Sequence, residues 1–355
     1  MTHIGEKESV TVPPIPDRTT DDARRSGMTG DDAPTDVSTD DVTGDDGPAA
    51  DAPVALITGA ARGLGAAVAK ALDTAGFRLV LLDLAVSDPA TPASPPARSA
   101  GMTAGATISD YGSAPASIAD TSGASGIAGV ASTVQPPVKV SYPFATRAQL
   151  EAVAAGCRTA VPVRGDVRLQ ADLDAAVATA LDRFGRLDAV VAAAGVIAGG
   201  PPGWETDDDT WRLLLDVNLT GVLTTARATL PALLRAPAGR FVAVSSAAGT
   251  RPLARLAAYA ASKHGVIGLV RSLAADLAGT AVTANVVCPG SMDTTMLMET
   301  ASIYDLDSPA EFAQHAYLRR LLDPAEVAAA AAFLCSPAAG GLTGAVIPVD
   351  GGFTG

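Results

Sequence analysis

Three residues in the second half of the chain have the types and spacing needed for proton transfer. Tyr259 and Lys263 are four positions apart, so on a helix they lie one above the other on one face. Ser246 precedes Tyr259 by thirteen residues. The chain has only four lysines against twenty-one arginines. A surface salt bridge would accept arginine, so the lysine at position 263 indicates a role that needs a compact ammonium.

A tyrosine can act as an acid or base at neutral pH only if its environment lowers its pKa. The phenol has an ordinary pKa of about 10, and bringing it to about 7 requires about 4 kcal/mol of preference for the phenolate. A neighbouring ammonium has the right charge for this. We interpret Tyr259 as the acid/base and Ser246 as the hydroxyl that orients a substrate oxygen. A serine that ends a strand and a tyrosine buried in the core are the structural alternatives.

A glycine-rich turn follows the first apolar run of the chain. Val54–Thr58 is predicted to be a buried strand, and Ala66–Ala75 has the composition of a helix. The glycines between them are Gly59, Gly63 and Gly65. A strand, a glycine turn, a helix and a carboxylate about 20 residues later are typical of dinucleotide binding. Backbone N–H groups at the start of such a helix bind the pyrophosphate.

The carboxylate of this pattern is Asp83, the last residue of a second predicted strand, Phe77–Asp83. It is expected to accept hydrogen bonds from the adenosine ribose, and its charge would repel a 2′-phosphate, so NAD is favoured over NADP. Arg62 points the other way, because a guanidinium could bind that phosphate. Asp166, at the end of a later strand, is expected either beside the adenine or in an ordinary turn.

Composition divides the chain into an acidic N-terminal segment and a larger part with an ordinary charge balance. Residues 1–52 carry thirteen acidic and four basic residues of a chain whose net charge is −13. This segment is poor in apolar residues and is predicted to be a disordered tail. The remainder has no basic surface for nucleic acid and no apolar run long enough for a membrane. Three scattered cysteines predict no disulfide framework and no metal site, and a cytoplasmic location.

From residue 53 onwards, strands alternate with helices, which predicts one doubly wound parallel sheet with helices on both faces. Residues 86–137 interrupt the pattern as a low-complexity insertion within the catalytic domain 53–355. The later strands are predicted at Thr159–Val163, Leu187–Ala193, Arg240–Ser245, Ala281–Val287 and Ala345–Val349. The later helices are predicted at Thr146–Ala155, Leu169–Phe184, Thr210–Leu234, Ala257–Ala278 and from Asp323. Short helical pieces are expected between Pro289 and Leu322.

These motifs together resemble the short-chain dehydrogenase/reductase family over residues 53–355. The residues that carry the resemblance are Thr58-Gly-x-x-x-Gly-x-Gly65, Asn218, Ser246, Tyr259-x-x-x-Lys263, and Pro289-Gly290 with Thr294. The resemblance implies that Tyr259 is the acid/base and that Lys263 binds the nicotinamide ribose and lowers the pKa of Tyr259. It implies that Asn218 holds a water of the proton relay. A polar residue packed inside a helix is the alternative for Asn218.

The same resemblance implies a set of cofactor-binding residues along the carboxyl ends of the strands. Ala192-Ala-Ala-Gly195 departs from the family pattern, which has asparagines at the first two positions, so the support of the central strand is in question there. The implied cofactor-binding residues are Thr58, Gly59, Arg62, Gly63, Leu64, Gly65, Asp83, Asp166, Val167, Ala194, Gly195, Tyr259, Lys263, Pro289, Gly290 and Thr294.

Several stretches resemble a narrower branch, the mycofactocin-coupled dehydrogenases. They are Tyr142–Leu150, Ala192–Gly200, Trp204-Glu-Thr and Asp350–Gly355. The resemblance implies a tightly held NAD that does not freely exchange, with mycofactocin as the external electron acceptor. It also implies a homotetramer or homodimer. The acidic tail 1–52 has no counterpart in the family pattern, and the insertion 86–137 is longer than the branch implies.

The segment after Gly290 is rich in thioether and aromatic side chains, which suit a small apolar alcohol or carbonyl substrate. Packing against the protein's own core explains them equally well. The segment's candidates are Met292, Met296, Leu297, Met298, Ile303, Tyr304, Phe312 and Tyr317. Two other functions stay open: an ordinary carbonyl reductase that exchanges NAD(P)H freely, and a catalytically silent nucleotide-sensing or scaffold protein.

Overall fold

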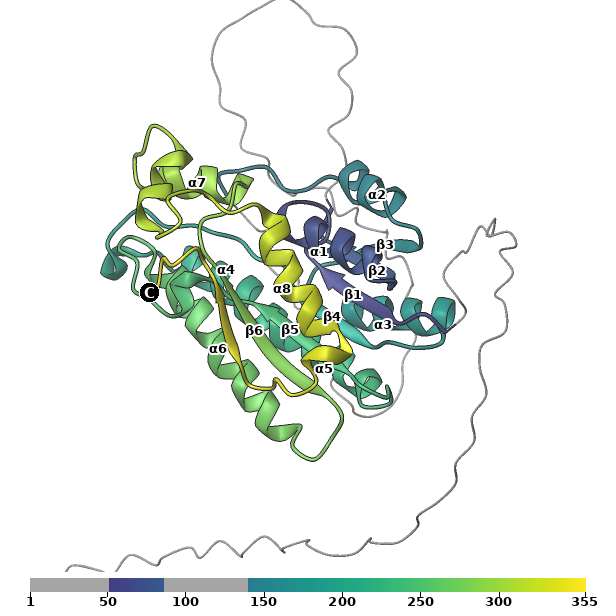
Figure 1. Ribbon diagram of the computed structural model, residues 1–355. Helices are drawn as coiled ribbons and strands as arrows, with labels where there is room; N and C mark the ends of the chain where they lie inside the picture. The colour runs from purple at the N-terminus through teal and green to yellow at the C-terminus, as the bar shows by residue number, and fades with distance from the viewer. Residues whose placement is uncertain (1–50, 86–139) are drawn as a thin grey trace, which may run out of the picture. The chain divides into compact units, whose positions relative to one another are not determined.

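A seven-stranded parallel sheet forms the centre of the part of the chain that the structure describes (Figure 1). The structure is a computed structural model that describes residues 51–85 and 140–355. The strand order is β3-β2-β1-β4-β5-β6-β7, which confirms the predicted doubly wound sheet. The strands are β1 Val54–Thr58, β2 Arg78–Asp83, β3 Ala160–Arg164, β4 Ala189–Ala192, β5 Arg240–Val244, β6 Thr283–Pro289 and β7 Val346–Val349.

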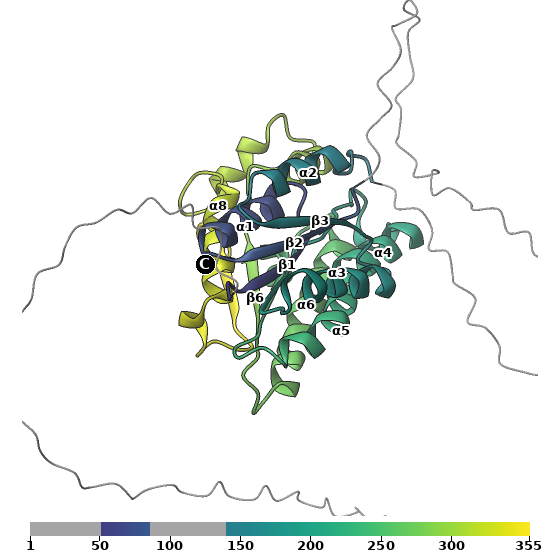
Figure 2. The ribbon, with the colours of Figure 1, turned by 90° about the vertical axis from the view of Figure 1, so that its right-hand side faces the viewer.

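Helices cover both faces of the sheet, as Figure 2 shows with α1 and α8 on one side and α3, α5 and α6 on the other. Strands buried on both faces need apolar side chains at consecutive positions, and all five residues of β1 are buried. Alternate residues of β1 therefore enter two separate cores. The α-helices are α1 Gly63–Thr74, α2 Arg147–Ala155, α3 Gln170–Phe184, α4 Asp208–Leu215, α5 Gly221–Leu233, α6 Ala257–Asp276, α7 Thr295–Ile303 and α8 Pro324–Cys335.

The helix predicted over Thr210–Leu234 is interrupted. It consists of α4, a π-helical turn at Asp216–Thr220 and α5. A π-helical turn inserts one extra residue into the helix and changes the direction of nearby side chains. Asn218 lies within this π-helical turn, so the interruption bears directly on a predicted site residue.

A local signal sets the start of α8, which begins next to the predicted Asp323. Asp323 caps α8 through its side chain, with Pro324 at the first helical position and Glu326 completing a capping box. No helix in residues 51–85 or 140–355 is both long enough and apolar enough to span a bilayer. The predicted tail 1–52, apart from its last two residues, and the predicted insertion 86–137 lie outside the described residues.

Candidate active site

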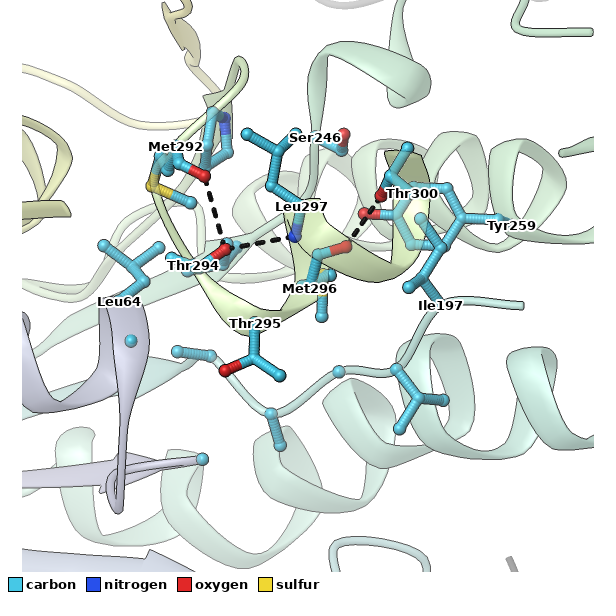
Figure 3. Close-up of a pocket in the computed structure, with 18 of the residues that line it drawn as sticks. Leu64, Ile197, Ser246, Tyr259, Met292, Thr294, Thr295, Met296, Leu297 and Thr300 are labelled. Carbon is cyan, nitrogen blue, oxygen red and sulfur yellow. Dashed lines mark hydrogen bonds between the residues drawn. The ribbon is translucent and has the colours of Figure 1, made fainter. Parts of the chain in front are cut away.

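A cavity of about 930 Å³ opens at the carboxyl ends of the strands. It runs from the glycine turn before α1 to the segment around α7, and Ser246, Tyr259 and Lys263 all line it. In the view of Figure 3, Leu64 lies on the left and Tyr259 and Ile197 lie on the right, with α7 drawn between them. In open parallel sheets this edge is where ligands bind. The two parts of the predicted site thus face one cavity.

Tyr259 projects from the first turn of α6 and is only 6% exposed. Burial raises the pKa of its phenol, and a hydrogen bond with the Ser246 side chain opposes that rise. Ser246 follows β5 and caps a short 3-10 helix by accepting from the N–H of Ala248 at 3.1 Å. The hydroxyl and the phenol are therefore brought together from two elements. Without a further positive charge, this site favours the neutral phenol.

Lys263 lies one turn after Tyr259 on α6, and its ammonium is buried with it. The Nζ atom lies 5.7 Å from the centre of the Tyr259 ring and donates to the main-chain carbonyl of Val244 at 3.1 Å. Burial lowers the pKa of Lys263 to about 8, against a weaker raising effect of Cys288. The spacing argument is confirmed: Tyr259 and Lys263 share one face of one helix and line one cavity.

The buried ammonium makes a testable contribution to stability. Because the folded protein releases this proton near pH 8 and the unfolded chain near 10.5, the unfolded state binds more protons between these values. The contribution of Lys263 to the free energy of unfolding therefore rises with pH in this window and is lowest below pH 8. The variant Lys263→Met lacks this pH-dependent contribution. Between pH 8 and pH 9.5, the free energy of unfolding of wild type should therefore rise by about 2 kcal/mol relative to that of Lys263→Met.

Urea unfolding of both proteins at the two pH values measures this difference. Lys70→Met, which removes an exposed lysine of α1, is the control for losing one positive charge. An equal difference between wild type and Lys263→Met at both pH values would contradict the lowered pKa of Lys263.

Asn218 is fully buried, and its side-chain amide is bound by protein groups. Its Oδ1 accepts from the N–H of Val196 at 2.8 Å, and its Nδ2 donates to the Val196 carbonyl at 2.9 Å and to Ser262 Oγ at 3.1 Å. The side chain therefore fixes the loop after β4 to the π-helical turn and to α6. Binding of a water in a proton relay by Asn218 stays a prediction.

The glycine turn is packed too closely for any side chain at two positions. A Cβ on Gly65 would lie 2.0 Å from the carbonyl oxygen of Gly59, and a Cβ on Gly59 would lie 2.7 Å from Ala194 Cα. Gly59 also has a φ of +70° and Gly63 a φ of +54°, which glycine adopts readily. The turn thus brings the start of α1 against β1 and the loop after β4.

The start of α1 is open to a ligand. Within the described residues, Arg62 at the N-cap provides no side-chain cap, and the first turn has no acidic residue. Uncapped N–H groups at a helix start, together with the helix dipole, form a binding site for anions. Gly63, Leu64 and Gly65 line the cavity there, so the residues present fit a pyrophosphate.

The two predicted carboxylates at the strand ends have different partners. Asp83 accepts from the N–H of Ala61 at 3.0 Å and from the N–H of Ala85 at 3.2 Å, so it holds the glycine turn against the end of β2. Asp166 forms a largely buried ion pair with Arg168 at 2.6 Å. Both line the cavity, as does Val167. Asp83 fits the predicted ribose acceptor, whereas the carboxylate of Asp166 already binds a guanidinium.

The remaining predicted residues close the other sides of the cavity. Thr58 accepts from the N–H of Ala194 at 3.2 Å and joins β1 to the loop after β4. Gly195 faces Lys263, because a Cβ there would lie 3.5 Å from Nζ. Thr294 caps α7, as the dashed lines in Figure 3 show. A Cβ on Gly63 would lie 3.7 Å from Thr294 Cγ2, so α7 begins beside the glycine turn.

Tyr142 is a site residue whose contacts the sequence did not reveal. Its hydroxyl accepts from the N–H of Ile197 at 3.1 Å, and the guanidinium of Arg62 lies 5.8 Å from the centre of its ring. Burial raises its pKa to about 12. Its neighbour Ser141 donates to Glu299 of α7. The segment 140–146 therefore contacts the glycine turn, the loop after β4 and α7. The sequence signal for this segment was the resemblance of Tyr142–Leu150 to the narrower branch, which did not indicate these contacts.

The segment after Gly290 contributes mainly apolar side chains to the cavity lining. Six of the eight candidates from the segment after Gly290 line the cavity, whereas Ile303 packs into the core and Tyr317 is 71% exposed. The lining candidates are Met292, Met296, Leu297, Met298, Tyr304 and Phe312. Leu253, Leu256 and Leu306 join them. An uncharged substrate fits such a surface.

Comparison with known proteins agrees with this geometry. A family model described as enoyl-(acyl carrier protein) reductase matches residues 124–354. An uncharacterized oxidoreductase of Mycobacterium tuberculosis is 38% identical over 228 residues, which is 60% of this chain and 82% of the relative. The (-)-trans-carveol dehydrogenase of Rhodococcus erythropolis is 37% identical over 233 residues, 61% of this chain and 84% of the relative.

Solved structures show the same fold. The structure of carveol dehydrogenase from Mycobacterium avium in complex with NAD matches with a TM-score of 0.68 and 28% identity. The match covers 87% of this chain and 99% of that one. The alternation of strands and helices in this chain thus builds an architecture that these dehydrogenases share.

Proposed function

This chain belongs to the short-chain dehydrogenase/reductase family, and we propose that it transfers hydride between a small apolar alcohol or carbonyl compound and NAD. We further propose that the NAD is held tightly and that mycofactocin removes its electrons. The observation that supports this most is the shared cavity. A start of α1 that fits a pyrophosphate and the buried Ser246, Tyr259 and Lys263 face the same space.

The site's own residues fit NAD. At Gly59 and Gly65 a Cβ would collide with backbone atoms, so only glycine fits this tight turn. Asp83 lies at the end of β2, where the acceptor for the adenosine ribose is expected. Arg62 lies against the Tyr142 ring, which supports NAD over NADP. When bound, NAD supplies the ring carbon that accepts or gives up the hydride.

In the proposed reaction, Tyr259 takes the proton of the substrate alcohol during oxidation and returns it during carbonyl reduction. Ser246, hydrogen-bonded to Tyr259, orients the substrate oxygen. Burial raises the pKa of Tyr259, so positive charge must act against it. Lys263 carries that charge below a pH of about 8, and it would also hold the nicotinamide ribose. Asn218 positions Val196 beside them.

Tight NAD binding is supported by the contacts of the segment 140–146, whereas coupling to mycofactocin rests on the sequence resemblance alone. Tyr142 contacts Arg62 at the phosphate end and Ile197 beside the reaction centre, and Ser141 contacts α7. Arg62, Tyr142 and Ile197 all line the cavity, so release of a cofactor bound there would be expected to require some of these contacts to break. The rival function, a carbonyl reductase that exchanges NAD(P)H freely, needs this segment to open in each turnover. The expected homotetramer or homodimer also stays a prediction.

Purified protein should therefore contain nicotinamide cofactor without any being added. Mass spectrometry of the denatured protein should show NAD, and apolar alcohols should reduce an artificial electron acceptor with no NAD in the buffer. An empty protein that turns over added NADH would support the freely exchanging reductase instead. A protein that neither contains nor binds a nucleotide would sink the proposal altogether.

The role of Tyr142 can be tested in the same experiment. Tyr142→Ala removes both the ring beneath Arg62 and the hydroxyl bound to Ile197, so it should raise the rate of cofactor loss on dialysis by about tenfold. Phe333→Ala, which removes a half-exposed ring from α8, is the control. Equal cofactor retention in the two variants would show that Tyr142 does not restrict release.

A further inference from the structure

Two residues whose sequence neighbours line the cavity share an uncommon backbone conformation and bind each other. Arg255 has a φ of +63° and Asp305 a φ of +56°. Residues other than glycine adopt this left-handed conformation infrequently, since their Cβ is crowded there. The Arg255 guanidinium contacts Asp305 Oδ2 at 2.9 Å. An unfavourable conformation at both ends of one contact indicates that the surrounding structure selects it.

Arg255 also holds a third segment. Its Nε donates to the carbonyl of Gly200 at 2.6 Å, and its own carbonyl accepts from the N–H of Gly200 at 3.0 Å. A Cβ on Gly199 would lie 2.4 Å from the Arg255 carbonyl oxygen. The loop after β4 and the loop before α6 are thus in direct contact, with Arg255 between Gly200 and Asp305.

A further hydrogen bond joins the loop before α6 to the end of α7, the two segments that the Arg255–Asp305 ion pair also joins. The hydroxyl of Tyr304, next to Asp305, donates to the carbonyl of Ala254, next to Arg255, at 2.7 Å. The Tyr304 ring meets Phe312 edge to face, with ring centres 6.0 Å apart. We call Arg255, Tyr304 and Asp305 the loop clasp. It connects the segments after β4, after β5 and after α7.

The clasp is placed to control the shape of the cavity. Leu253 and Leu256 flank Arg255, Leu306 follows Asp305, and all three line the cavity together with Tyr304. The guanidinium and carboxylate themselves do not line it. A movement of either segment would therefore shift apolar lining without placing a charge against the substrate.

Stability alone does not account for the clasp. The side chain of Asp305 is 79% exposed and that of Arg255 is 38% exposed. Exposed ion pairs contribute little to the free energy of folding, whereas two left-handed residues oppose it. The contacts instead fix where three loops stand relative to one another.

We propose that the loop clasp sets the width of the cavity where Leu253, Leu256 and Leu306 line it, and thereby selects compact over bulky uncharged alcohols. This inference rests on the proposed dehydrogenase function. Arg255 and Asp305 are positioning residues in it, because they act through Leu253, Leu256 and Leu306. Tyr304 both holds the clasp together and lines the cavity itself. Loosening them should weaken substrate binding and selectivity and leave the proton transfer at Tyr259 unchanged.

Arg255→Asn is the sharpest variant, because asparagine tolerates the left-handed conformation and lacks the guanidinium. We expect KM for cyclohexanol to rise about fivefold to tenfold with kcat within about twofold of wild type. The preference in kcat/KM for cyclohexanol over 4-tert-butylcyclohexanol should fall towards one. Tyr304→Phe keeps the ring against Phe312 but loses the hydroxyl. It should also raise KM for cyclohexanol and lower the preference in kcat/KM, each by a smaller factor than Arg255→Asn.

The control is Arg212→Gln, which breaks an exposed ion pair of Arg212 with Asp208 on α4. It should change neither KM for cyclohexanol nor the preference in kcat/KM. The double variant Arg255→Asn/Asp305→Asn should resemble Arg255→Asn alone, because the two residues share one contact. Tyr304→Phe keeps the test possible if Arg255→Asn does not fold.

The two proposals fail in different ways. Wild type that oxidises none of the alcohols and reduces none of the matching ketones would contradict the dehydrogenase function. In that case the clasp proposal is tested by binding alone: the Kd of 4-methylcyclohexanone, measured by calorimetry, should be higher for Arg255→Asn than for wild type. An unchanged KM or Kd, unchanged selectivity, or a loss of kcat at constant KM in folded variants would overturn the clasp proposal.

Discussion

Tyr259→Phe is expected to lower the rate of hydride transfer by about 10³-fold to 10⁴-fold, while the protein stays folded and keeps its cofactor. Phenylalanine fills the same buried space beside Ser246 but has no proton to give or take. Positive charge from Lys263 would then have no phenol on which to act. The change is one oxygen atom at a position that is only 6% exposed, so its effect on packing should be small.

Single-turnover measurements separate chemistry from binding in this variant. Alcohol is mixed with cofactor-loaded protein, and the appearance of reduced nicotinamide is followed by its fluorescence. Tyr317→Phe makes the same chemical change at a tyrosine that is 71% exposed and does not line the cavity, and it should react at the wild-type rate. If Tyr259→Phe keeps more than about a tenth of the wild-type rate, Tyr259 is not the acid/base.

Gly65→Ala is expected to destabilise the protein by about 3 kcal/mol and to abolish cofactor binding. The added methyl would lie 2.0 Å from the carbonyl oxygen of Gly59 and 3.0 Å from Ala60 Cα. These are backbone atoms, so no side-chain rotation relieves the collision. The start of α1 must move away from β1, and the N–H groups that fit a pyrophosphate move with it.

Gly268→Ala is the matched control for this prediction. Gly268 lies inside α6, and nothing lies within 4 Å of the position its Cβ would take. The same substitution there should stabilise the protein by about 0.5–1 kcal/mol, because alanine favours the helix. Denaturant unfolding gives both stabilities, and nucleotide content of the purified variants gives the binding. Normal nucleotide content in Gly65→Ala would show that the turn does not hold the pyrophosphate.

Features with a local cause were predictable from the sequence. Val54–Thr58 forms β1 with the predicted bounds, because a fully buried strand needs an unbroken apolar run. Asp323 caps α8 because its side chain meets backbone N–H groups two or three residues ahead. Tyr259 and Lys263 share a face because they are one helical turn apart.

Features that depend on distant residues were not predictable. Tyr142 meets Ile197 across 55 residues, and Asn218 meets Val196 across 22. Arg255 and Asp305 are 50 residues apart. Side chains of these types can form hydrogen bonds with many partners. Which partner each one meets depends on which loops the order of the strands brings together. The π-helical turn at Asp216–Thr220 also has no glycine or proline within it to announce a break.

The described residues on either side of the predicted insertion suit the chain to protein engineering. Ala85 is buried and donates its N–H to Asp83, and Tyr142 is buried and tied to Ile197. Each side is thus held by contacts inside the domain. Leu84 and Tyr142 line the cavity on the two sides of this insertion, so a fluorescent reporter attached beside Leu84 could signal when the cavity fills.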